Sequence, residues 1–66
     1  MQPHQQRVVD EFTELQDKLT KLDNFISSDK FEEIVSDKDE RHRLIVQFGY
    51  MRSYASVLKE RIDNFN

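Results

Sequence analysis

Arginine and tyrosine residues recur along the second part of this chain at a spacing that places them on one side of a helix. The intervals alternate between four and three residues, and the set is Arg43, Gln47, Tyr50, Tyr54, Val57 and Arg61. Aromatic rings stack on nucleobases, and guanidinium groups hold phosphates through paired hydrogen bonds. This set, called the Tyr/Arg ridge below, therefore predicts a site for a small anionic nucleotide. Its candidate ligand-binding residues are Arg43, Tyr50, Tyr54 and Arg61.

The same ridge is also typical of a contact between helices, because aromatic residues at helical spacing usually belong to a core or an interface. Gly49 lies within it, and a helical glycine, which costs about 1 kcal/mol relative to alanine, often permits close approach of a neighbouring helix. Ile45 and Val46 add apolar area nearby. The expected oligomer interface consists of Val46, Gly49, Tyr50, Tyr54 and Val57. A ligand site and an interface thus remain open as alternatives.

The sequence offers few residues for disulfides, metal binding or catalysis. The chain has no cysteine, and neither His4 nor His42 has carboxylates around it at ligand spacing, so we expect neither disulfides nor a metal site. No nucleophile lies at a suggestive spacing from a base, and we expect no enzymatic activity and no cofactor.

The net charge and the hydropathy disfavour nucleic acids and membranes as partners. A net charge of −3 disfavours general nucleic-acid binding, for which a basic domain is expected. No apolar run approaches the roughly 20 residues that span a bilayer, and residues 1–7 have no hydrophobic signal-peptide core. We therefore expect a cytoplasmic protein without a membrane partner.

Two apolar heptad stripes predict the elements that carry these residues. The first consists of Val8, Phe12, Leu15, Leu19, Leu22 and Ile26. The second consists of Leu44, Phe48, Met51, Ala55, Leu58, Ile62 and Phe65. We predict helices over about 3–27 and 38–64 and a short helix over about 29–35, which an Asp29–Glu32 capping box would begin. The fold class is all-α, a single-domain antiparallel two-helix hairpin with a short connecting helix.

Self-association is expected from the small size of the chain and from the Tyr/Arg ridge. A chain of 66 residues buries little apolar surface and usually needs a disulfide, a metal or a partner subunit. One partner helix cannot cover both the stripe and the ridge of residues 38–64. We therefore predict a homo-oligomer that assembles as a helical bundle.

The chain resembles a group of very short tailed-phage proteins of helical-hairpin type. The resemblance covers nearly the whole chain, through residues 1–11, Leu15, Lys18-Leu19, Lys21-Leu22, Phe25-Ile26, Phe31, Met51, Tyr54, Val57-Leu58 and Arg61-Ile62. More distantly, it is similar to the hairpin of phage anti-CBASS and anti-Thoeris sponge proteins, which form oligomers and sequester cyclic nucleotide immune signals without cleaving them. That similarity rests on the polar cluster before Val8, and it implies that His4, Gln5 and Arg7 contact the ligand.

Three functions follow as hypotheses. The first is a phage counter-defence protein that sequesters a small anionic nucleotide signal, such as a cyclic nucleotide, without catalysis. The second is a protein–protein inhibitor or adaptor of anti-CRISPR or host-takeover type, which docks on a host protein through the ridge. The third is a structural helical bundle with no ligand.

Overall fold

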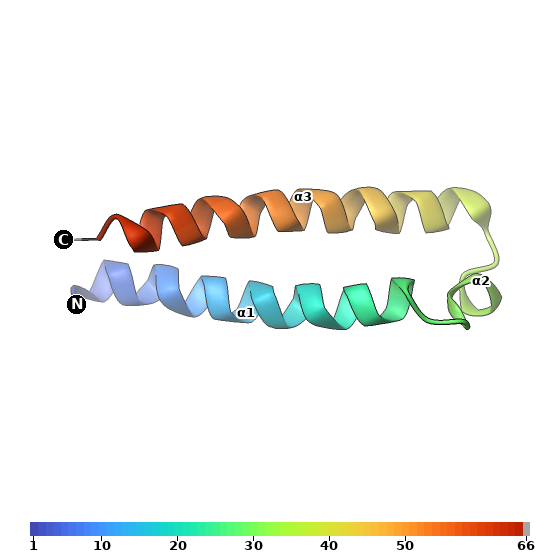
Figure 1. Ribbon diagram of the computed structural model, residues 1–66, viewed down its shortest axis with the longest axis horizontal. Helices are drawn as coiled ribbons and strands as arrows, with labels where there is room; N and C mark the ends of the chain where they lie inside the picture. Colours follow the sequence, from blue (N-terminus) through green and yellow to red (C-terminus); the bar gives the residue numbers. More distant parts are fainter. Residues whose placement is uncertain (66) are drawn as a thin grey trace.

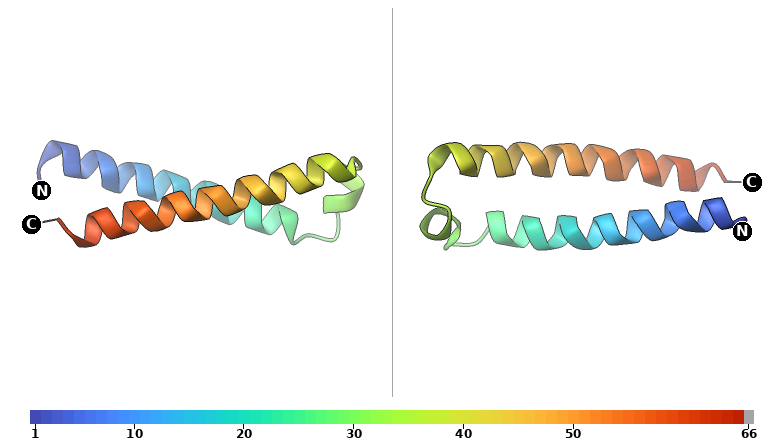
Figure 2. Two further views of the ribbon diagram at one scale, coloured as in Figure 1. Left: turned by 90° about the horizontal axis from the view of Figure 1, so that it is seen from above. Right: turned by 180° about the vertical axis from the view of Figure 1, so that it is seen from behind.

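The protein folds as a long helical hairpin. The computed structural model describes residues 1–65, which contain α1 (Pro3–Ile26), α2 (Phe31–Ile34) and α3 (Lys38–Asp63). Helices α1 and α3 lie side by side and antiparallel, with both chain termini at one end and α2 at the other (Figure 1). The molecule measures 47 × 15 × 14 Å, and the two long helices cross at a shallow angle (Figure 2). The predicted all-α class and the packing of two long helices are confirmed.

The start of α1 follows from its first residues. Pro3 occupies the first helical turn, where its missing N–H would have had no helical partner. The backbone N–H of Gln2 donates to Oε1 of Gln5 at 2.9 Å. At the other end the N–H of Ser27 donates to the carbonyl of Asp23 at 2.9 Å. Gln5, a candidate ligand residue, therefore helps to begin the helix.

The turn between the long helices is held by one aromatic pair and one arginine. Phe31 is buried in α2, and its ring meets that of Phe25 edge-on with centroids 5.3 Å apart. Nη1 of Arg41 donates to the carbonyl oxygens of Val35 at 2.8 Å and Ser36 at 3.0 Å. These contacts close the hairpin end from which α3 starts.

A side chain caps the start of α3, but none caps the start of α2. Asp37 is the N-cap of α3, and its Oδ1 accepts from the N–H of Asp39 at 2.9 Å. The capping box expected from Asp29 to Glu32 was wrong, because the N-cap of α2 is Lys30 and no side chain caps it. A helix of four residues is held here by the burial of Phe31 rather than by a cap.

Replacing the cap tests this difference. We expect Asp37→Ala to lower the free energy of unfolding by about 1 kcal/mol, because an orphan N–H of α3 loses its acceptor. Asp29→Ala, the matched control, removes the same group from a helix that it does not cap, and the change should be much smaller. Urea denaturation followed by circular dichroism measures both, and equal losses would contradict the assignment.

The core is a single seam between α1 and α3. Its buried residues are Val8, Leu15, Leu19, Ala55 and Leu58, with Phe12, Phe48, Met51, Ile62 and Phe65 packed around them. Among residues 1–65, only Leu58 is fully enclosed, at 0% exposure. Both predicted stripes therefore face one another, but the core is thin. Within residues 1–65, no helix has the length and apolar character needed to cross a membrane.

Candidate ligand and assembly surface

The Tyr/Arg ridge lies beside the seam and stays exposed. Helix α1 covers the apolar stripe of α3, whereas the ridge is rotated away from it around the helix. Tyr50 remains 74% exposed and Val57 52% exposed, which is unusual for side chains of this size. The hairpin thus leaves a continuous aromatic and aliphatic strip open to solvent along α3.

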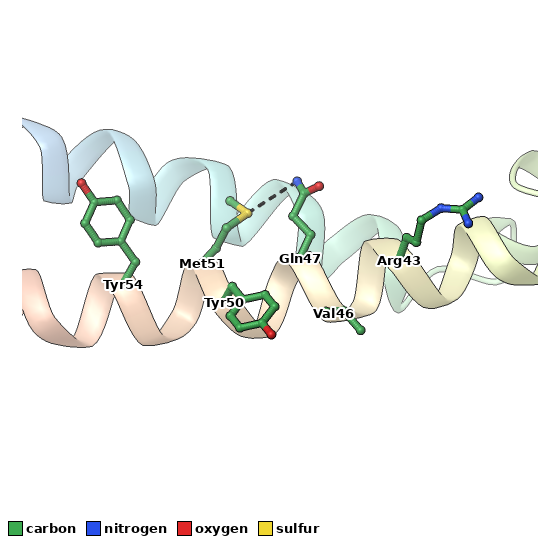
Figure 3. Close-up of a pocket in the computed structure, with 6 residues that line it drawn as sticks. All are labelled: Arg43, Val46, Gln47, Tyr50, Met51 and Tyr54. Carbon is green, nitrogen blue, oxygen red and sulfur yellow. Dashed lines mark hydrogen bonds between the residues drawn. The ribbon is translucent and has the colours of Figure 1, made fainter.

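A shallow groove of about 530 Å³ follows the first part of this strip. Its walls are mostly carbon, and it is lined by Arg43, Val46, Gln47, Tyr50, Met51 and Tyr54 (Figure 3). Gln47 and Tyr54 extend toward α1, whereas Tyr50 and Val46 turn away from it. The groove therefore brings three candidate ligand residues together, Arg43 at one end and the two tyrosines along its length.

Ile45 does not join this surface. The sequence expectation that it adds apolar area beside the ridge was wrong, because Val46 lines the groove and Ile45 does not. Consecutive residues of a helix project about 100° apart, so Ile45 points to the far side of α3. It remains 49% exposed there and offers an apolar control position off the ridge.

A contact across the helices anchors one end of the groove. The hydroxyl of Tyr54 donates to Oε2 of Glu11, a residue of α1 that is 43 positions away in the chain. Sequence reasoning missed Glu11, because nothing local marks which acid of α1 faces the ridge. Arg7 lies one turn before Glu11 on the same face of α1, which places it on the ridge side of the hairpin.

Arg43 already pairs with two carboxylates of its own chain. Its Nε donates to Oε1 of Glu40 at 2.8 Å, and its Nη2 lies 3.8 Å from Oδ2 of Asp37. The hydrogen bond with Glu40 raises the pKa of the Arg43 guanidinium above its ordinary value. Arg43 is therefore a fixed positive charge, and an incoming anion must compete with Glu40 for it.

The remaining cationic candidates lie at the opposite end of the hairpin. Arg61 is in the last turn of α3, and His4 and Arg7 are in the first turns of α1, where the two chain ends meet (Figure 1). Arg43 and Arg61 are 18 positions apart on α3, which corresponds to about 27 Å. One chain therefore cannot place both arginines on the same small ligand.

The structure places two cationic side chains, Arg52 and Lys59, around a hollow outside the Tyr/Arg ridge. The guanidinium carbon of Arg52 lies 5.8 Å from the ring centroid of Phe48. This smaller hollow, of about 270 Å³, is lined partly by Arg52, Gln16 and Lys59. In the part of the chain that the structure describes, no group of three or more His, Cys, Asp or Glu side chains is arranged to hold a metal.

Gly49 offers a test of its predicted place in an interface. A Cβ built on it meets nothing within 4 Å, so the hairpin itself does not require glycine there. We expect Gly49→Ala to raise the free energy of unfolding by up to about 1 kcal/mol through helix propensity. Urea unfolding of dilute protein measures this gain, and Ser53→Ala on the same side of α3 serves as the comparison. Destabilisation by Gly49→Ala would instead show that a neighbouring helix packs on this glycine.

Comparison with known proteins places the chain in a family. The family model described as Sequestin matches residues 2–64. A relative from Enterobacteria phage T4 is 37% identical over 65 residues, which cover 98% of each chain, and is described as an uncharacterized 7.5 kDa protein in the denB-rIIB intergenic region. Among solved structures, none matches significantly. The chain is thus similar over nearly its full length to a small phage protein, and it belongs to the Sequestin family.

Proposed function

We propose that this protein is a phage counter-defence factor that binds a small anionic nucleotide immune signal and sequesters it without catalysis. The observation that carries the proposal is the groove on α3, in which Tyr50 and Tyr54 lie along an apolar wall that ends at Arg43. A planar base and a phosphate need these two kinds of surface side by side.

The energetics of the groove fit a nucleotide of modest size. Stacking on an aromatic ring contributes about 1–3 kcal/mol per base, and a charge-assisted hydrogen bond to a phosphate contributes about 1.5–3 kcal/mol. The six lining residues include no serine, cysteine, lysine, histidine or carboxylate. This composition supports the proposal that the groove binds a ligand and retains it as the intact molecule.

The comparisons support the biological setting of the proposal. The family name, Sequestin, hints at sequestration, and the relative described above is encoded by a phage. A phage protein that removes a host signal from solution needs affinity and abundance rather than turnover. A short chain without catalytic groups in its groove suits that task.

Thermal shift against cyclic dinucleotides, cyclic trinucleotides and ADP-ribose derivatives tests the proposal. A ligand that binds only the folded protein and is present at 100 times its Kd stabilises it by about 2.7 kcal/mol. The ligand released by heating should be chemically unchanged on chromatography. Tyr50→Ala should abolish the shift and Tyr50→Phe should preserve most of it, because the ring stacks and the hydroxyl does not. Absence of any shift across the panel would count against sequestration.

A second candidate is docking on a host protein through the same surface. The specific observation that favours it is the largely carbon wall of the groove, which is flanked by exposed valines. Such a strip suits a partner helix laid along α3. Light scattering separates the two functions, since a stable monomer that gains no stability from nucleotides would favour this alternative.

A further inference from the structure

The exposed side of α3 reads nearly the same in both chain directions. Apart from Gln47, which follows Val46, it presents in order Arg43, Val46, Tyr50, Tyr54, Val57 and Arg61, that is arginine, valine, tyrosine, tyrosine, valine and arginine. The centre of this series is Arg52, with the tyrosines two positions before and after it and the arginines nine positions before and after it. A two-fold interface requires the same patch on both copies, with each residue facing its counterpart from the other end. The series meets that requirement.

We propose that α3 pairs antiparallel with α3 of a second copy about a two-fold axis that crosses the ridge side of the helix level with position 52, and that each end of the pair completes an anion site. In this register Tyr50 lies opposite Tyr54 of the partner subunit, and Val46 lies within one residue, about 1.5 Å along the axis, of the position opposite Val57 of the partner subunit. Arg43 lies beside Arg61 of the partner subunit at both ends. The proposed dimer does not depend on the proposed function, whereas the proposed anion sites rest on that function.

Charge complementarity selects the antiparallel direction. On the ridge side of α3, Asp39 lies in the first turn and Arg61 lies in the last turn. Asp39 lies one turn before Arg43 on the same side of α3, about 6 Å along the axis, within reach of Arg61 of the partner subunit. An antiparallel pair therefore places Asp39 near Arg61 of the partner subunit at each end, where it offsets the charge of the neighbouring Arg43. A parallel pair would instead place Asp39 opposite Asp39 of the partner subunit and Arg61 opposite Arg61 of the partner subunit.

Apolar burial supplies the driving force. The described part of the hairpin fully encloses one side chain, Leu58, and it leaves Tyr50, Val57 and Val46 74%, 52% and 40% exposed. Pairing along this strip removes both valines and the tyrosine rings from water without disturbing the α1–α3 seam. The second copy thus covers the surface that α1 leaves open.

The pairing also brings Arg43 of one subunit close to Arg61 of the partner subunit. Within one chain Arg43 and Arg61 lie about 27 Å apart, but the antiparallel partner brings its own Arg61 next to Arg43. The start of α1, with His4 and Arg7, lies at the same end of the hairpin as Arg61 (Figure 1). Each end of the dimer then gathers Arg43 from one subunit and the terminal cluster of the other.

Cysteine cross-linking tests the register, because the wild-type chain contains no cysteine. Val46→Cys and Val57→Cys are made separately, mixed in denaturant, refolded together and oxidised. The two sites are exposed in the hairpin, so each variant should retain its helical circular dichroism signal. We expect a disulfide dimer in the mixture and none from either variant alone, because only unlike positions face each other and disulfides need Cα atoms within about 7 Å.

The control pair is Ile45→Cys with Lys59→Cys, which are matched in the same register but point away from the ridge. These two should not cross-link in the mixture. Cross-linking of Val46→Cys or Val57→Cys with itself would indicate a parallel pair and overturn the proposal. A monomer by light scattering, or a dimer in which the Val46→Cys and Val57→Cys mixture forms no disulfide, would overturn it as well.

The shared site is tested by complementation, with 3′,5′-cyclic diguanylate and the other thermal-shift ligands as probes. Arg43→Ala and Arg61→Ala dimers should each bind the stabilising nucleotide at least tenfold more weakly. Refolding the two variants together yields mixed dimers in which one of the two sites has both arginines, so a fraction of sites should regain wild-type affinity. No regain in cross-linked mixed dimers would overturn the shared site. If wild-type protein binds no nucleotide but the disulfide pattern is found, the assembly stands and the proposed function and its anion sites fail.

Discussion

Replacing Leu58 with alanine should destabilise the protein more than any other single substitution on α3. Leu58 is fully enclosed, the one such side chain in the part of the chain that the structure describes, and it belongs to the core cluster with Val8, Leu15 and Ala55. Leucine-to-alanine changes in cores cost about 2–5 kcal/mol, because apolar contacts are lost and a cavity remains. A domain of this size has little stability to spare. We therefore expect Leu58→Ala to be largely unfolded in dilute solution.

The measurement is thermal and urea unfolding by circular dichroism, with Ile45→Ala as the control. Ile45 is a similar aliphatic residue on the same helix, but it is 49% exposed and lies outside the core cluster. Its truncation should change the unfolding free energy by well under 1 kcal/mol, as surface substitutions usually do. Similar losses in the two variants would mean that the α1–α3 seam is not the main source of stability.

Loss of Arg43 should weaken nucleotide binding more than loss of any other charged side chain of α3. Its guanidinium ends the groove, and a charge-assisted hydrogen bond contributes about 1.5–3 kcal/mol, or roughly 10–150-fold in affinity. Arg43→Ala also leaves Glu40 without its partner at the mouth of the site, which adds repulsion toward an anion. Isothermal titration with the nucleotide found by thermal shift measures the loss.

Two further variants make this prediction specific. Arg52→Ala removes an arginine from the far side of α3 and should leave binding nearly unchanged. Glu40→Gln removes the carboxylate that competes for Arg43 and should tighten binding, although it also removes an exposed ion pair of small energetic value. Equal losses in Arg43→Ala and Arg52→Ala would indicate a nonspecific effect of net charge rather than a site on the ridge.

Much of the fold could be predicted from periodicity and helix-end chemistry. The heptad spacing from Val8 to Ile26 and from Leu44 to Phe65 identifies two long helices, and the structure shows Asp37 as the side-chain cap that begins α3. These signals are local, since a helix repeats every 3.6 residues and its ends need side-chain partners. Asp29 carried the same local signal and was misleading, because burial of Phe31 decides where α2 lies.

The candidate site was less predictable, for a physical reason that its residues illustrate. Tyr50 and Tyr54 share one helix face and could be grouped from spacing alone. Glu11 could not be paired with Tyr54, because the alignment of α1 against α3 depends on how the Phe25–Phe31 contact and Arg41 close the turn. Ile45 was misplaced because being near in sequence does not mean sharing a helix face.

The sequence by itself therefore determined the helices, their apolar stripes and the presence of a Tyr/Arg ridge that one partner helix cannot cover. The tertiary structure alone decided that the ridge remains exposed beside the seam and that Glu11 of α1 meets Tyr54 of α3. Periodicity specifies which residues share a face of one helix. Which residues of two different helices lie close together depends on where the chain reverses and on how the helices pack.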